Sequence, residues 1–218
     1  MMGKSYFITA TGTELGKTWL TDGLVAAVRA QGGTVCALKP VMSGYDPVRH
    51  EESDVATVGA GRTAWCYAAP LSPDCAAAKE GKAIDFAALA DWCRGEIETN
   101  DGLLLIEGVG GVMVPLTACH TVRDWIAALD IPALLVCGTY LGAISHTLSA
   151  LAALREAGIV PERLIVNESA GSTVSIDDTL VSLEPHLGGL PFEVLRRDDV
   201  AGVARLAERL LGSPINNR

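Results

Sequence analysis

The stretch Thr9–Ala10–Thr11–Gly12–Thr13–Glu14–Leu15–Gly16–Lys17–Thr18 joins a short apolar run, 6–8, to a run of helical character, 19–30. It ends in Gly-Lys-Thr, as phosphate-binding loops do, where small residues let backbone N–H groups turn toward phosphate oxygens. The N-terminus of the following helix adds a partial positive charge. In this motif the lysine reaches the outer phosphates and the threonine hydroxyl ligates Mg²⁺. The stretch therefore predicts a nucleoside triphosphate site.

The loop departs from the usual pattern at its start. The motif places a glycine five residues before Gly16, where this chain has Thr11, and the nearest small residue upstream is Ala10. The alternative is a strand–turn–helix corner that carries Gly-Lys-Thr by chance. The strand before the loop and the helix after it are the context that the motif requires, so they favour the phosphate loop.

The composition limits the kinds of partner. The 218 residues carry a net charge of −9 and are 49% hydrophobic, which predicts one domain, 1–218, that binds neither nucleic acid nor a membrane surface. The six cysteines include no C-x-x-C pair, which argues against a metal site or a disulfide framework. No signal peptide is evident and no apolar run reaches the roughly 18 residues that span a bilayer, so a cytoplasmic protein is expected.

Apolar runs alternate with segments of helical periodicity along the chain. The expected strands are 5–10, 34–38, 103–106, 133–137, 164–166 and 190–194. The expected helices are 17–31, 84–97, 122–129, 145–157, 173–183 and 200–211. Residues 39–54 are expected to form a loop, and 55–82 to form short helices and loops. The alternation predicts an α/β fold of the P-loop type, a mostly parallel central sheet with helices on both faces, which binds ligands at the carboxyl ends of its strands.

Polar residues follow several of these strands. Mg²⁺ prefers carboxylate and hydroxyl oxygens together with phosphate and water, so we expect its ligands to be Thr18, Glu107 and, from the acidic loop, Asp54. The alternatives are a surface or helix-capping role for Glu107 and a solvated or capping role for Asp54. Lys39 follows the second strand and would steady charge on a transferring phosphoryl group beside Lys17, unless it is an exposed strand-end lysine.

Two more polar residues are weaker candidates. Ser43 lies in the same loop as Lys39 and is either a site residue or a plain turn serine. His146 lies one turn into an expected helix and is more readily explained as a packed or dimer-contact residue than as a catalytic base.

The complete set of motifs resembles the dethiobiotin synthetase family. The family's G-T-D-T-E-V-G-K-T loop corresponds to residues 10–18, and its K-P-x-x-S-G segment to residues 39–44. Further matches are S-D at 53–54, E-G-A-G-G at 107–111, P-L at 115–116, L-G-x-x-x-H at 141–146 and an asparagine after a late strand at 167. The motifs occur in family order from residue 6 to about residue 191, and together they are highly specific.

The resemblance implies an ATP- and Mg²⁺-dependent cyclo-ligase that converts 7,8-diaminononanoate and CO₂ to dethiobiotin, with release of ADP and phosphate. In that family the diamine forms a carbamate, ATP phosphorylates the carbamate, and the second amine closes the ureido ring. By matching position, Lys17 and Lys39 would stabilise the carbamate and the transferring phosphate. Thr18, Asp54 and Glu107 would hold Mg²⁺.

The resemblance also implies the remaining contacts and a homodimer. The residues implied for the nucleotide are Thr13, Glu14, Leu15, Gly16, Lys17, Thr18, Asn167 and Pro191, the last two at adenine. The residues implied for the substrate are Ser43, Gly110, Leu141, Gly142 and Ser145. The Leu141–Gly142 turn and the helix N-terminus after it would bind the substrate carboxylate across the dimer interface, since a helix N-terminus receives an anion without a lysine.

This chain differs from the family pattern at four of these positions. Ala10 replaces the first glycine of the loop and Gly12 its aspartate, and these positions bear on loop geometry and nucleotide preference. Tyr140 and Ser145 replace the lysine and the asparagine that are common beside the Leu-Gly turn, and these positions bear on carboxylate affinity.

Other functions share parts of the pattern. A nucleotide-switch ATPase of the partitioning or septum-site kind has the same fold and loop, but it usually carries an additional lysine near the position of Thr11. Amide ligases of cobalamin synthesis are longer and include a glutaminase domain, for which 218 residues leave no room. A regulatory module that has lost the chemistry would not be expected to keep the complete set of Lys17, Thr18, Lys39, Asp54 and Glu107.

Overall fold

A six-stranded parallel sheet forms the centre of the protein in a computed structural model, which describes residues 3–46 and 62–212. Its strands are β1 (Lys4–Ala10), β2 (Val35–Leu38), β5 (Leu103–Glu107), β6 (Ala133–Cys137), β7 (Arg163–Asn167) and β8 (Phe192–Leu195). They lie in the order β2-β5-β1-β6-β7-β8, and every pairing is parallel. The predicted fold class is confirmed.

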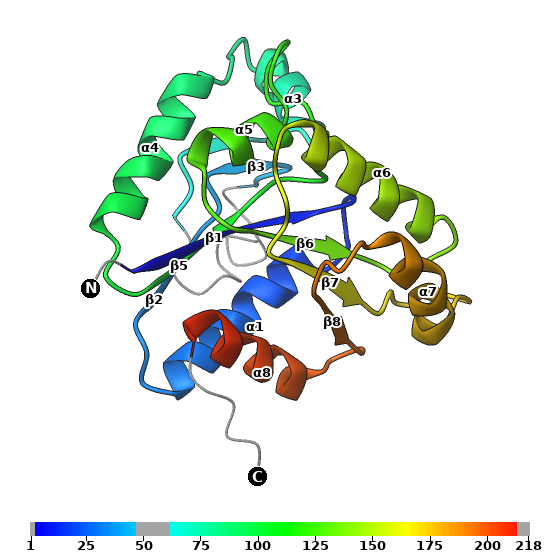
Figure 1. Ribbon diagram of the computed structural model, residues 1–218. Coiled ribbons are helices and arrows are strands. Elements are labelled where there is room, and N and C mark those ends of the chain that lie inside the picture. Colours follow the sequence, from blue (N-terminus) through cyan, green and yellow to red (C-terminus); the bar gives the residue numbers. More distant parts are fainter. Residues whose placement is uncertain (1–2, 47–61, 213–218) are drawn as a thin grey trace.

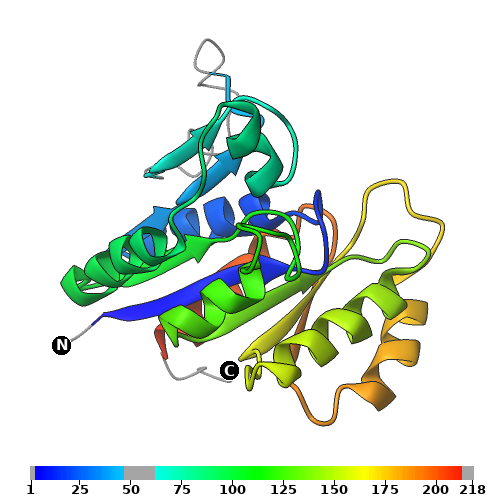
Figure 2. The same cartoon turned by 90° about the horizontal axis from the view of Figure 1, so that it is seen from above.

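Helices lie on both faces of this sheet (Figures 1 and 2). One face carries α1 (Lys17–Ala30) and α8 (Val200–Leu211), which pack against each other. The other face carries α4 (Phe86–Thr99), α5 (Val122–Leu129), α6 (Ala143–Glu156) and α7 (Ile176–Leu183). The observed bounds of α5, β6 and α8 equal the predicted ones.

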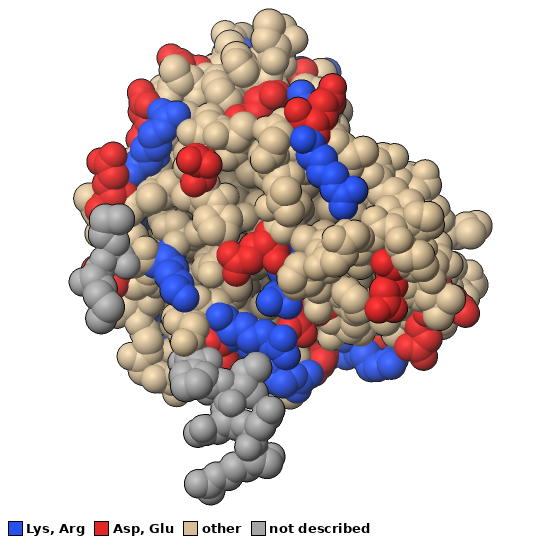
Figure 3. Space-filling view, in the orientation of Figure 1, with Lys and Arg blue, Asp and Glu red and all other residues tan. Residues whose placement is uncertain are grey.

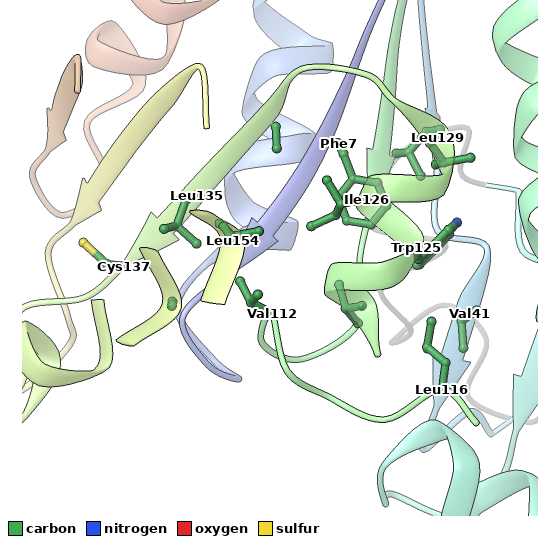
Figure 4. Close-up of a cluster of buried hydrophobic side chains, with 14 of the residues drawn as sticks. Phe7, Val41, Val112, Leu116, Trp125, Ile126, Leu129, Leu135, Cys137 and Leu154 are labelled. Carbon is green, nitrogen blue, oxygen red and sulfur yellow. The ribbon is translucent and has the colours of Figure 1, made fainter. Parts of the chain in front are cut away.

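The side chains of strand β1 pack alternately against the helices on the two faces of the sheet. Successive side chains of a strand point to opposite faces of the sheet. Tyr6 and Ile8 therefore pack with α1 and α8, whereas Phe7 packs with the helices of the other face. Phe7 meets Trp125 of α5 edge to face, with ring centroids 4.9 Å apart, at the centre of the cluster in Figure 4. Burial on both faces explains why these strands are almost wholly apolar.

The prediction of a continuous loop after Lys39 is wrong. Val41–Ser43 forms strand β3, which pairs in parallel with β4 (Trp65–Tyr67) in a separate two-stranded sheet. The expectation of only helices and loops in 55–82 fails at β4 and holds for α3 (Pro73–Lys79). Three-residue strands have too little periodicity to detect, and their pairing connects segments distant in the sequence.

Several observed element boundaries differ from the predicted ones, and the starts of two helices differ because of the residues that cap them. Helix α6 begins two residues earlier than predicted, directly after Gly142, which has a left-handed φ of 100°. Helix α7 begins later than predicted, at Ile176, because the Ser175 side chain accepts a hydrogen bond from the Asp178 N–H and forms an N-cap. Strand β8 corresponds to the strand predicted at 190–194 and lies at an edge of the sheet, but it begins after Pro191 rather than before it.

Two further expectations concern surfaces and membranes. Acidic and basic side chains are interspersed on the face in Figure 3, with no broad basic area there. In the part of the chain that the structure describes, no helix is long and apolar enough to cross a membrane.

Candidate functional site

The phosphate-binding loop lies between the end of β1 and the start of α1. Within it, Glu14 and Gly16 have positive φ values of 59° and 87°, which bring the chain sharply into the helix. Two features favour glycine at position 16. Any other residue would be strained at this backbone conformation, and its Cβ would lie only 2.4 Å from the Asn167 side-chain nitrogen. The departures at Ala10 and Gly12 are compatible with this loop, since neither residue has a positive φ. Ala10 is simply the last residue of β1.

Two neighbouring strands supply the charged partners of this loop. Lys39 directly follows β2, and Glu107 ends β5, which pairs with both β2 and β1. The Lys39 Nζ lies 2.7 Å from the Glu107 Oε1 in an ion pair whose side chains are 6% and 0% exposed. The Thr18 hydroxyl donates to the same oxygen at 2.8 Å. The strand order therefore brings the predicted Lys39 and Glu107 to the first turn of α1.

The two carboxylate oxygens of Glu107 have different surroundings. Among residues 3–46 and 62–212, its Oε2 is buried without a hydrogen-bond partner. A buried acceptor in that condition costs roughly 1–3 kcal/mol, so a ligand at that position would recover stability. Carboxylate and hydroxyl oxygens are the ligand types that Mg²⁺ accepts, and the donor set of Glu107 and Thr18 fits that ion. Asp54, the third predicted ligand, lies outside the described residues.

Lys17 points across the loop from the start of α1. Its Nζ donates to the Gly110 carbonyl at 2.7 Å and to the Gly12 carbonyl at 3.4 Å. Gly110 belongs to the turn after β5 and has a positive φ of 60°. The amine therefore lies over the loop, between carbonyl groups of the loop itself and of the turn after β5.

One cavity of about 490 Å³ collects most of the predicted catalytic residues. Its walls include Thr13, Glu14, Gly16, Lys17, Thr18, Lys39, Ser43, Glu107 and Gly110. Met42 and Val109 complete the lining, and the sequence alone did not indicate them. Ser43 is therefore part of the cavity wall rather than a turn residue elsewhere, and it is the last residue of β3.

A second, smaller cavity of about 230 Å³ lies between the loop and the turns that follow β7 and β8. It is lined by Glu14, Leu15, Gly16, Trp19, Asn167, Glu168, Ser169, Ala170, Arg197 and Asp198. The Asn167 side-chain nitrogen donates to the Leu15 carbonyl at 2.9 Å and so holds the end of β7 against the phosphate loop. Two cavities that share one phosphate loop have the arrangement that a nucleotide needs, with phosphates in one and the base in the other.

The second cavity contains residues that the sequence did not indicate. The Glu168 carboxylate accepts a hydrogen bond from the Arg197 backbone N–H at 2.8 Å, which joins the turns after β7 and β8. The position of Glu168 directly after Asn167 was the one signal available in the sequence. Pro191, predicted at the nucleotide base, lies before β8 and lines a different cavity with Arg163 and Phe192. The structure does not bring it to Asn167.

A third cavity, of about 900 Å³, also borders the phosphate loop. Its lining includes Thr13, Met113, Tyr140 and His146, and the Tyr140 hydroxyl lies 2.6 Å from the His146 Nδ1. Leu141, Gly142 and Ser145 stand at the nearby start of α6, and Leu141 is 88% exposed. These three residues line none of the cavities around the loop.

In the described part of the chain, no cysteine lines any of the three cavities around the phosphate loop. Burial raises the pKa of the Cys137 thiol, at the end of β6, to about 12, and burial raises the pKa of Cys93 to about 12 as well. Both thiols are therefore protonated and unreactive near neutral pH. Within residues 3–46 and 62–212, no group of three His, Cys, Asp or Glu residues is placed to hold a metal ion.

A Gly-Lys-Thr loop that leads into a helix on a parallel sheet, with Lys39 and Glu107 facing it, defines a P-loop nucleotide-binding protein. A family model described as an AAA domain matches residues 4–196. The "ATP-dependent dethiobiotin synthetase BioD" of Acidiphilium cryptum (strain JF-5) is 44% identical over 203 residues, which cover 85% of this chain and 89% of that protein. The chain belongs to the ATP-dependent dethiobiotin synthetase family.

Other comparisons agree with that membership. The protein of the same name from Caulobacter sp. (strain K31) is 40% identical over 221 residues, with 97% of this chain and 96% of that protein covered. Among solved structures, the MinC:MinD cell division complex of Aquifex aeolicus has a TM-score of 0.60 at 13% identity, covering 99% of each chain. The ParA family ATPase of Chlorobium tepidum TLS has a TM-score of 0.57 at 12% identity, covering 98% of this chain and 94% of that one. These two similarities concern the fold alone.

Proposed function

We propose that this protein is an ATP-dependent dethiobiotin synthetase that carboxylates 7,8-diaminononanoate with CO₂ and closes the ureido ring, with release of ADP and phosphate. The observation that carries the proposal is the meeting of Lys17, Lys39, Thr18 and Glu107 around one cavity. Family membership supports the identity of the substrates. The switch-ATPase alternative has support only from the fold.

The reaction needs positive charge beside two anions. A neutral amine of the diamine adds CO₂ and loses a proton to give a carbamate, whose oxygen then attacks the γ-phosphorus of ATP and displaces ADP. The ammonium groups of Lys17 and Lys39 would attract the carbamate and stabilise the charge on the transferring phosphoryl group. The second amine then attacks the carbonyl carbon, phosphate leaves, and the ring closes.

Thr18 and Glu107 would hold Mg²⁺, and Asp54 is proposed as the third ligand. The unpartnered Oε2 of Glu107 supports this assignment. The metal would neutralise charge on the phosphate oxygens of bound ATP. In the second cavity, Asn167 and Glu168 are proposed to contact the nucleotide base.

The substrate is proposed to bind in a homodimer. Leu141, 88% exposed, and Met113, 50% exposed, stand beside the third cavity, and burial against a second copy would remove this apolar surface from water. The N-terminus of α6 after Gly142 would then receive the carboxylate of a substrate bound to the partner subunit. Ser43 and Gly110 would contact the diamine end.

The test is phosphate release with each substrate omitted in turn. Release that requires ATP, the diamine and bicarbonate together, with dethiobiotin identified by mass spectrometry, is the expected result. CTP and GTP are compared with ATP in the same assay to establish nucleotide preference. Phosphate release that is independent of the diamine would instead indicate a switch ATPase. The Lys17→Ala variant is expected to lose nearly all turnover, because its ammonium group would contact the reacting phosphate.

A further inference from the structure

Two hydroxyl residues join the loops that follow β6 and β7. The Thr139 backbone N–H donates to the Ser169 Oγ at 3.0 Å. In return, the Ser169 backbone N–H donates to the Thr139 Oγ1 at 3.0 Å. Each side chain therefore satisfies the backbone of the other residue, so the two bonds fix the distance between the two loops.

The surroundings of this pair hold it in place. Thr139 is fully buried, and its carbonyl accepts a third bond, from the Ser172 hydroxyl, at 2.7 Å. A Cβ on Gly138 would lie 2.5 Å from the Ser169 Oγ, so glycine is what lets that hydroxyl approach. Because the Thr139 N–H is buried, loss of the Ser169 hydroxyl would leave it without its acceptor.

The two loops serve different cavities. The end of β7 and the loop after it carry Asn167 and Glu168 into the 230 Å³ cavity proposed for the nucleotide base. The loop after β6 carries Tyr140 into the wall of the 900 Å³ cavity and leads to the Leu141–Gly142 turn. Ser169 lies in the walls of both cavities. A displacement of either loop would therefore be transmitted to both.

We propose that Thr139 and Ser169 are positioning residues that hold the nucleotide-base loop and the substrate-carboxylate turn in one fixed arrangement. The proposal rests on the proposed function, which assigns ligands to these two cavities. Neither residue lines the cavity that holds Lys17, Lys39 and Glu107. In the homodimer, the pair would connect the base cavity of one subunit to the carboxylate of a substrate bound to the other.

The test compares Thr139→Val and Ser169→Ala with the unmodified enzyme. Each variant is expected to raise the KM for ATP and the KM for the diamine together, by roughly 5- to 10-fold, because one displaced pair of loops serves both ligands. The kcat is expected to stay within about 2-fold, because the reacting groups lie elsewhere. Thr139→Val is the more direct probe, since that side chain is fully buried and touches no solvent.

Three controls separate positioning from general stability. Thr139→Ser and Ser169→Thr keep the hydroxyls and are expected to restore both KM values. Thr179→Val removes another buried threonine hydroxyl, which donates to the Ser175 carbonyl at 2.9 Å at the start of α7, and is expected to leave both KM values unchanged. Circular dichroism and thermal unfolding of every variant identify those that fail to fold. If Thr139→Val or Ser169→Ala is among them, the other of the two is compared with Thr139→Ser and Ser169→Thr.

The outcomes are distinct. A rise in both KM values that the conservative variants reverse supports the proposal. Unchanged KM values, a rise in only one of them, or the same rise in Thr179→Val overturns it. Failure of the proposed function looks different, because the unmodified enzyme itself would then show no diamine-dependent release of phosphate.

Discussion

The buried ion pair between Lys39 and Glu107 permits the sharpest prediction about stability. Replacing Lys39 by methionine keeps an unbranched side chain of similar length and removes its charge, which leaves the Glu107 carboxylate at 0% exposure without its cation. At 2.7 Å and an effective dielectric constant of about 20, the lost attraction is about 6 kcal/mol. Two features reduce the net loss. Thr18 still donates to the carboxylate, and water in the 490 Å³ cavity can approach it.

The expected loss is therefore near the lower end of the range for breaking a buried pair, about 3 kcal/mol. For a chain of this length, that corresponds to a fall in Tm of about 6–12 °C. Urea unfolding followed by tryptophan fluorescence measures the free energy, and the urea dependence (the m-value) checks that the transition stays comparable. Adding Glu107→Gln to Lys39→Met removes the unpaired charge, so the double variant should recover most of the loss.

The chain supplies a matched control. Lys82 pairs with Glu80 at the same 2.7 Å separation, but these side chains are 60% and 27% exposed. Lys82→Met should change stability little, because water screens an exposed pair. The reasoning would be refuted if Lys39→Met cost no more than Lys82→Met, or if the double variant were less stable than Lys39→Met alone.

Two further predictions concern the phosphate loop and a helix cap. Gly16→Ala should abolish detectable ATP binding in calorimetry while the protein stays folded, because its Cβ would displace Asn167 from the loop; unchanged affinity would contradict the geometry. Asp124 is partly buried, which opposes ionisation, but hydrogen bonds from Thr121 and the nearby Arg123 together lower its pKa. A carboxyl group with a lowered folded-state pKa stabilises above its unfolded pKa, so Asp124→Ala should cost about 1 kcal/mol at pH 7 and less as pH falls below about 4. Urea unfolding at pH 7 and pH 3 checks this, and an equal loss at both would contradict it.

The layered fold was predictable because its signals are local. The runs 103–106 and 133–137 are apolar on every residue, as strands covered on both faces must be, and they are strands. The short strand β3 was not predictable, because it depends on β4, more than twenty residues away. Helix starts were less certain than helices themselves, since a cap at Gly142 or Ser175 depends on backbone conformation.

The candidate site was predictable as a set of residues and less so as an arrangement. Lys17, Lys39 and Glu107 were all identified from their positions in the sequence. Lys17 lies at the end of the phosphate loop, and Lys39 and Glu107 each lie at the end of an apolar run. Pro191 was misplaced, because the sequence does not show where β8 begins relative to the proline. Glu168 and Arg197 were missed, because their contact joins turns of two different strands.

The phosphate loop illustrates the division between sequence and structure. By itself, the sequence determined that a helix begins after Gly16, and it predicted phosphate binding by Lys17 and Thr18, because both depend on a few adjacent residues. Only the tertiary structure decided that Lys39 and Glu107 meet there, because β5 lies between β2 and β1 in the sheet. Strand order is set by packing over the whole chain, and no local pattern carries it.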